Sequence, residues 1–110
     1  MAQRDDAIDL GEFGRFSDPA LLILVSLADG PKHGYAITED IAVFADVRFG
    51  PGSLYGAIAR LESRGLIEAL KSDHRRNPYR LTARGDKALR ARLASMAAVT
   101  RVGQKRLASA

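Results

Sequence analysis

Apolar residues recur at helical spacing in four segments of this 110-residue chain, residues 19–29, 33–45, 51–64 and 83–110. In the third segment, Leu54, Ile58 and Leu61 follow one another at i, i+4 and i+7, which marks one face of a helix. The first segment is apolar on nearly every side, as in a helix buried among several neighbours. The pattern therefore predicts four helices, the first of them buried on several sides.

Residues with capping chemistry stand at the ends of these segments. Asp18 and Thr82 precede the first and last helices, where a side-chain oxygen can accept a backbone N–H. Pro51 suits the first helical position of the third helix, with Gly50 as its N-cap. Gly65 is expected to close that helix in the left-handed conformation.

Two short stretches between the third and fourth helices predict a β-hairpin. "LIEALK" (66–71) and "PYRL" (78–81) flank the basic sequence "SDHRRN", which is typical of two antiparallel strands around a loop. Pro78 has no N–H group to donate, so its strand is expected at a sheet edge. Helices followed by a hairpin in this order predict a mostly α fold, a winged helix-turn-helix with a two-stranded β wing and a C-terminal helix.

The net charge of +4 is divided unevenly along the chain. Residues 1–47 hold three basic and nine acidic side chains, a charge of −6, whereas residues 48–110 hold fourteen basic and four acidic ones, a charge of +10. This asymmetry favours a polyanionic partner for the second half. A basic surface that only meets solvent is the alternative.

The third helix has an unusually bare outer face. Opposite its apolar stripe lie only small residues, Gly52, Gly56, Ala59 and Ser63. A bare face lets a helix approach the DNA major groove, which is about 12 Å wide, while Ser53, Tyr55 and Arg60 can reach phosphates or base edges. The other explanation is that the glycines admit a second helix. In the hairpin loop, Arg75 and Arg76 can follow a phosphate backbone, unless the loop is simply solvated.

The sequence does not support catalysis or metal binding. It contains no cysteine, and its only histidines, His33 and His74, have no partners at metal-ligand spacing. His33 is instead expected to cap a helix or contact phosphate. We therefore expect no cofactor, no metal and no enzymatic activity. The longest apolar run is too short to cross a bilayer and no signal peptide is recognised, so a cytoplasmic protein associated with the nucleoid is expected.

The last helix carries an apolar stripe that a chain this short has too few residues to cover, Leu89, Leu93, Met96 and Thr100. A second copy of the helix is expected to cover it, giving a homodimer. In the N-terminal arm, Phe13 and Phe16 are expected to reach the partner, whether the arm is loose or packed. The chain is thus expected to comprise an acidic arm, a winged helix-turn-helix domain and a C-terminal dimerisation helix with tail, at residues 1–17, 18–82 and 83–110.

Three stretches together resemble the PadR family of bacterial transcription regulators: "LLILVSLADGPKHGYAI", "GPGSLYGAIARLESRGLI" and "YRLTARGDKAL". The resemblance covers most of the chain, from about Pro19 to Leu89. It implies a homodimer with one winged helix-turn-helix per subunit, the third helix in the major groove of operator DNA and the C-terminal helix in the dimer. It also implies a repressor that a small molecule or another signal releases.

By position, the resemblance implies which residues contact DNA. These are Ser53, Tyr55 and Arg60 in the third helix, Lys32, His33 and Tyr35 near the second helix, and His74, Arg75, Arg76 and Asn77 at the wing tip. The bare face of the third helix adds Gly56 to the expected DNA-binding residues. The alternative function is a winged helix that binds another protein and regulates without binding DNA. The basic second half of the chain favours DNA.

Overall fold

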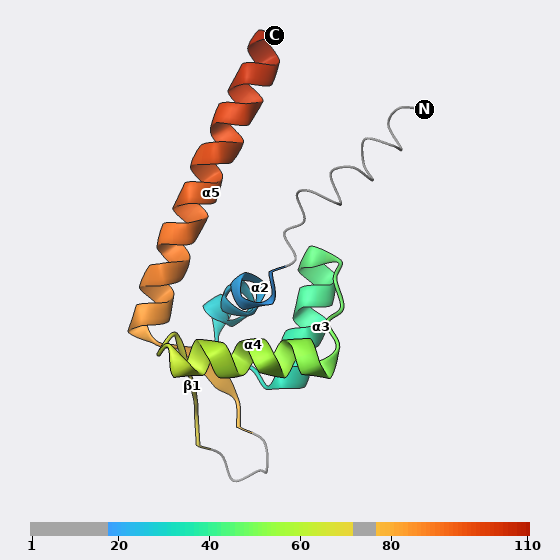
Figure 1. Cartoon of the computed structure of the whole chain (residues 1–110), viewed down its shortest axis with the longest axis vertical. Coiled ribbons are helices and arrows are strands. Elements are labelled where there is room, and N and C mark those ends of the chain that lie inside the picture. Colours follow the sequence, from blue (N-terminus) through green and yellow to red (C-terminus); the bar gives the residue numbers. More distant parts are fainter. Residues whose placement is uncertain (1–17, 72–76) are drawn as a thin grey trace.

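The computed structural model describes residues 18–71 and 77–110. Its elements follow the predicted order: α2 (Pro19–Ser26), a 3₁₀ turn (Leu27–Asp29), α3 (Gly34–Ala45), α4 (Pro51–Ser63), β1 (Ile67–Ala69), β2 (Tyr79–Leu81) and α5 (Ala83–Ser109). The two strands pair antiparallel, with Ile67 opposite Leu81. The mostly α fold with a two-stranded wing is therefore confirmed (Figure 1).

The predicted caps account for most helix ends. Asp18 accepts the amide N–H of Ala20 at 3.1 Å, and Thr82 accepts that of Gly85 at 3.0 Å. Gly65 has φ +73°, and the following amide of Leu66 donates back to the Leu61 carbonyl at 3.0 Å. This Schellman-type closure ends α4 and turns the chain into β1.

The first helix differs from the prediction, because α2 ends at Ser26 rather than at residue 29. The Ser26 carbonyl accepts the Lys32 ammonium, and the Gly30 amide donates to Leu27 at the shorter, 3₁₀ spacing. Lys32 thus captures a carbonyl that a longer helix would use for its own bonds.

The core forms around α2, which contacts α3, α4 and α5. Ile23, Ile37 and Ile41 are fully buried, and the predicted α4 stripe points into the same cluster. Leu89 of α5 is also buried there. The core thus fixes α4 with its opposite face outward.

The sheet has one contact beyond the two predicted strands. The Lys32 amide donates to the Tyr79 carbonyl at 3.0 Å, and the Tyr79 amide donates to the Lys32 carbonyl at 2.9 Å. β2 is an edge strand of the two-stranded sheet, as predicted, and the isolated bridge to Lys32 adds pairing on its outer side at Tyr79 alone. Pro78 lies one residue before this double pairing and loses no bond by lacking an N–H.

Helix α5 rises from the body as a long arm (Figure 1). Its 27 residues span about 40 Å at 1.5 Å per residue, in a molecule of 57 × 28 × 20 Å.

The carbonyl of Leu66 lies against Gly85 so closely that a Cβ there would come within 2.9 Å of the Leu66 carbonyl carbon. Among residues 18–71 and 77–110, no helix combines the length and apolarity needed to cross a membrane.

Candidate nucleic-acid interface

The bare face of α4 is open in the structure. A Cβ added at Gly52 would meet nothing within 4 Å, and one at Gly56 would meet only the Arg60 guanidinium at 3.6 Å. Ala59 and Ser63, on the same face, are exposed. None of the described residues therefore packs on this face, and packing within this part of the chain does not explain its small side chains.

The start of α4 also presents polar groups to solvent. Gly50 caps the helix without a side-chain hydrogen bond, so the backbone N–H groups of Gly52 and Ser53 have no cap. Helix N-termini of this kind favour phosphate groups, because the free N–H groups and the helix dipole attract anions. Ser53 and Arg60 are exposed on either end of the bare face.

Tyr55 connects α4 to the start of α3. Its ring is 43% exposed, yet its hydroxyl end lies against Gly34, where a Cβ would come within 2.7 Å of the ring carbon Cζ. The ring is thus a packing contact on one side and available to a ligand on the other.

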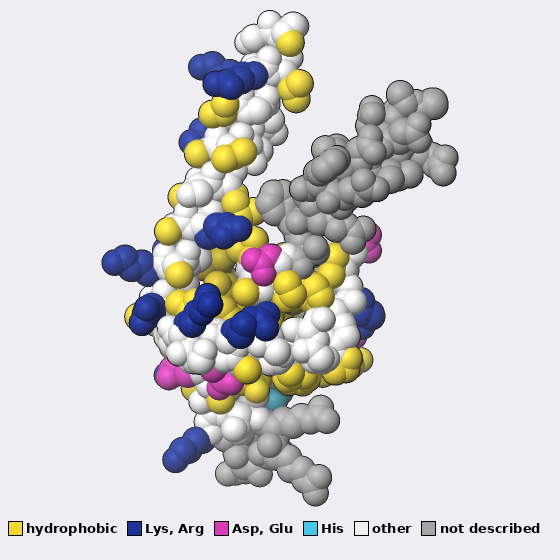
Figure 2. All heavy atoms as spheres, viewed as in Figure 1, with side chains coloured by type: hydrophobic (Ala, Val, Ile, Leu, Met, Phe, Trp, Pro, Cys, Tyr) yellow, Lys and Arg dark blue, Asp and Glu magenta, His cyan; other side chains and the backbone are white. Residues whose placement is uncertain are grey.

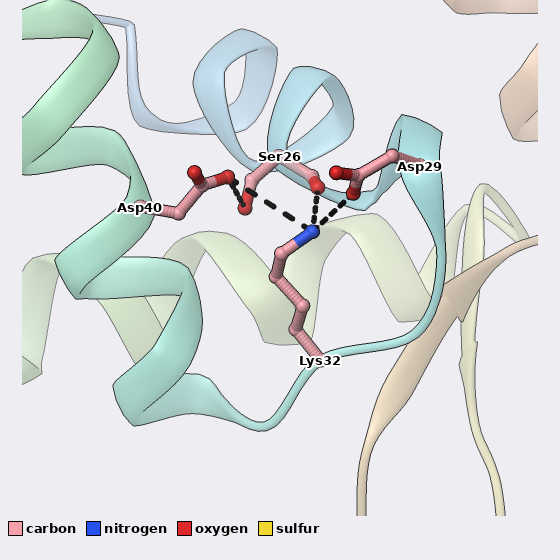
Figure 3. A network of polar contacts seen from close by, with 4 residues as sticks. All are labelled: Ser26, Asp29, Lys32 and Asp40. Atoms are coloured by element: carbon pink, nitrogen blue, oxygen red, sulfur yellow. Dashed lines mark hydrogen bonds and ion pairs between the residues drawn. The ribbon is translucent and has the colours of Figure 1, made fainter.

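The three residues predicted near the start of α3 lie in different surroundings. His33 is exposed at the N-cap, and Tyr35 is 68% exposed in the first turn. The Lys32 ammonium instead points inward, where it contacts the Ser26 carbonyl and the carboxylates of Asp29 and Asp40 (Figure 3). Lys32 is therefore occupied inside the protein, and we leave it out of the interface proposed below.

One basic residue near α4 was not singled out from the sequence. Arg48, in the link between α3 and α4, donates two hydrogen bonds to Glu39 of α3, at 2.6 and 3.4 Å. The hydrogen bond from Arg48 holds the pKa of Glu39 below its ordinary value. Only the charge of Arg48 was visible in the sequence, because its partner is set by the packing of two helices.

The wing is described only in part. His74, Arg75 and Arg76 lie outside the described residues, whereas Asn77 is exposed two residues before β2.

On the face shown in Figure 2, Lys and Arg side chains gather over α4 and the adjoining part of α5. The exposed basic residues of these two helices include Arg60, Arg84, Lys87 and Arg92, and Arg64 is exposed at the C-cap of α4.

The predicted dimer residues of α5 divide into two groups. Leu89 is buried in this chain's own core, and Met96 packs against that core in part. Leu93 is 42% exposed and Thr100 is exposed, followed by exposed Val102 and Leu107. Phe13 and Phe16 lie outside the described residues. Beyond Met96, α5 thus presents apolar side chains that the described part of the chain does not cover.

Side chains that could bind a metal ion are not grouped in the described residues. Within residues 18–71 and 77–110, no three His, Cys, Asp or Glu side chains are grouped so that they could hold a metal ion. The polar groups beside the bare face of α4 include the hydroxyls of Ser53 and Tyr55, the guanidinium of Arg60 and backbone N–H groups, all of a kind that can bind phosphates and base edges.

Comparison with known proteins identifies relatives of this arrangement. The model of the transcriptional regulator PadR-like family matches residues 23–91. A crystal structure of a PadR family transcriptional regulator from Eggerthella lenta has a TM-score of 0.75 at 27% identity, covering 97% of this chain and 96% of that one. A transcriptional regulator from Clostridium thermocellum has a TM-score of 0.69 at 30% identity, covering 79% and 87% of the two chains.

A longer relative occurs in Streptomyces fradiae. It is an uncharacterized 37.1 kDa protein in transposon TN4556, 47% identical over 83 residues, which are 76% of this chain. This chain spans about a quarter of that relative's length, 24%. The similarity therefore concerns one part of the longer protein.

Proposed function

Because this chain belongs to the PadR-like family of transcriptional regulators, we propose that it binds specific operator sequences in double-stranded DNA and regulates transcription from them. The observation that supports this proposal most is the open, small-residue face of α4. A Cβ added at Gly52 or Gly56 would clash with no atom of the described residues, so nothing in this part of the chain covers the face. Such a face allows the helix backbone to approach base edges in the major groove closely. The protein is thus a DNA-binding regulator rather than an enzyme.

The proposed contacts follow from the exposed groups around that face. Ser53, Tyr55 and Arg60 reach phosphates or base edges from α4, and His33 and Tyr35 lie beside the backbone at the start of α3. At the wing, His74, Arg75, Arg76 and Asn77 supply further contacts to phosphates. Arg48 joins this set although it pairs with Glu39, because its side chain is 60% exposed next to the start of α4, whereas that of Lys32 is only 19% exposed.

We further propose that two copies act together as a repressor in the cytoplasm, on the nucleoid. Helix α5 pairs with its counterpart through Leu93, Met96 and Thr100, and the arm residues Phe13 and Phe16 add to the contact. Two-fold symmetry then presents two α4 helices to half-sites about 34 Å apart, one helical turn of DNA. A small molecule or another signal that alters this pairing releases the operator.

Selection from a library of randomised duplexes on immobilised protein tests the function. Enriched sequences with two-fold symmetry and half-sites about ten base pairs apart support it. Anisotropy titrations against salt then count the phosphates, and Arg75→Ala with Arg76→Ala is expected to lessen the slope by about 1–2. A library without enrichment, together with no affinity for random duplex at low salt, points to the protein-binding alternative.

A further inference from the structure

The segment from Lys32 to Gly34 is where three elements of the proposed interface meet. On one side the backbone of Lys32 pairs with Tyr79, the first residue of β2, through two hydrogen bonds of 3.0 and 2.9 Å. On the other side the hydroxyl end of Tyr55 from α4 lies against Gly34. The same segment leads directly into α3. The wing strand, α3 and the DNA-facing helix α4 are thus all positioned through these three residues.

The side chain of Lys32 fixes this segment to the core. Its ammonium contacts the Ser26 carbonyl at the end of α2, the Asp29 carboxylate in the 3₁₀ turn and, at 4.0 Å, the Asp40 carboxylate of α3 (Figure 3). Asp40 also accepts the hydroxyl of Ser26, which is buried, at 2.7 Å. The Lys32 side chain is only 19% exposed. Its ammonium is therefore held mainly by these protein groups and little by solvent.

We infer that Lys32 is a positioning residue for DNA binding, which sets the wing relative to α4 through its ammonium without touching DNA. This inference rests on the proposed function. The backbone of Lys32 pairs with the wing strand while its side chain holds α2 and α3, so one residue transmits the position of the helices to β2. If the ammonium is removed, the two hydrogen bonds between Lys32 and Tyr79 are expected to open first. They form an isolated bridge, with no further strand pairing beside them on the Lys32 side.

The test replaces Lys32 with Met, which keeps the apolar stem and removes the charge. Lys105→Met is the matched control, since Lys105 is an exposed lysine near the end of α5, outside the basic group beside α4. Amide hydrogen exchange by NMR reads the pairing without any DNA: the Tyr79 amide is expected to exchange at least about tenfold faster in Lys32→Met, while the Thr82 amide, which donates to Leu66, keeps its rate. Lys105→Met is expected to change neither rate.

Affinity for a labelled random-sequence duplex of about 30 base pairs, long enough for two half-sites, provides the second readout. Lys32→Met is expected to bind at least about tenfold more weakly than the wild type at a temperature where both are folded. Unchanged exchange at Tyr79 with a salt slope smaller by about 0.9 would identify Lys32 as a direct phosphate contact and overturn the inference. Faster exchange with unchanged affinity would overturn it as well.

A milder variant covers the case in which Lys32→Met does not fold. Asp29→Asn removes one carboxylate partner of Lys32, and Asp29 is exposed, so the core is left intact. It is expected to move Tyr79 exchange and DNA affinity in the same direction by a smaller factor, and Asp46→Asn, an exposed aspartate at the end of α3, is its control. Equal effects of Asp29→Asn and Asp46→Asn on Tyr79 exchange and DNA affinity would overturn the inference. A wild type that binds no DNA would overturn the proposed function itself. The exchange data test only the link between Lys32 and Tyr79, so the two failures can be told apart.

Discussion

The ring of Tyr55 occupies the space that a side chain at residue 34 would need. A Cβ built on Gly34 would lie 2.7 Å from ring atom Cζ and 2.9 Å from Cε1. Since real Cβ atoms do not approach carbon this closely, the start of α3 and the first turns of α4 fit together only with glycine at this position. The pair thus links the two helices of the helix-turn-helix motif.

Gly34→Ala is expected to destabilise the protein by about 1–3 kcal/mol, because the added methyl group displaces the Tyr55 ring. Gly52→Ala is the control, since a Cβ there meets nothing within 4 Å, and it is expected to be neutral or to stabilise by up to about 1 kcal/mol. Denaturant unfolding measures both changes.

A double-mutant cycle ties the cost to the named contact. In a Tyr55→Ala background, Gly34→Ala should cost nothing. Tyr55→Phe should not relieve the clash, because the ring carbons remain in place. A cost that persists in the Tyr55→Ala background contradicts the assignment.

Gly85→Ala is expected to be more damaging, at about 3 kcal/mol, because the obstacle is backbone. The new Cβ would lie 2.9 Å from the Leu66 carbonyl carbon and nearer still to its oxygen. Moving Leu66 also strains the bond that its carbonyl accepts from the Thr82 amide at 3.1 Å. Gly103→Ala, in the open part of the same helix, should instead stabilise. Equal melting temperatures for the two variants would show that α5 tolerates a shift at its start.

The sequence allowed most helix ends, though not the end of α2, to be predicted because capping is local. Asp18, Thr82 and Gly65 each bond within a few residues of themselves, so the pattern of residue types is sufficient. The α4 stripe was predicted for the same reason. Both then determine which face of α4 is exposed, and this is the centre of the proposed interface.

The remaining features depend on residues far apart in the chain. Nothing near Lys32 in the sequence indicates that its backbone pairs with Tyr79 or that its ammonium reaches Asp40. The resemblance to the PadR family therefore implied only that Lys32 contacts DNA beside the start of the second helix. In the same way, the period of the α5 stripe shows that Leu89 shares a face with Leu93, but not that the chain's own core covers Leu89.

Gly56→Leu is expected to leave the fold intact while abolishing specific DNA binding. A Cβ at this position makes only an ordinary 3.6 Å contact with Arg60, and leucine favours the helix over glycine by roughly 0.8 kcal/mol. The larger side chain would hold α4 away from the groove. Gly56→Ala keeps the face small and should bind nearly as well as the wild type. Thermal unfolding and operator anisotropy separate the two effects, and wild-type affinity in Gly56→Leu would show that this face does not meet DNA.

Leu93→Asp is expected to convert a dimer into a monomer without unfolding the chain. At 42% exposure, the side chain at residue 93 meets solvent in the single chain, so a carboxylate there stays hydrated. Against a second α5 the same carboxylate would be desolvated without a partner, which costs several kcal/mol. Leu89 is unsuitable for this test, because it is buried in the core and its replacement would unfold the chain.

Sedimentation of the protein at micromolar concentration measures the outcome, with Val43→Asp as the control. Val43 lies on α3 and is 84% exposed, so the same charge placed there should leave the dimer and its DNA affinity unchanged. The Leu93→Asp monomer should lose affinity for paired half-sites, since each chain then binds only one. A wild type that sediments as a monomer, or a Leu93→Asp protein that remains a dimer, would show that α5 does not pair in this way. The exposed apolar residues beyond Met96 would then require a different partner.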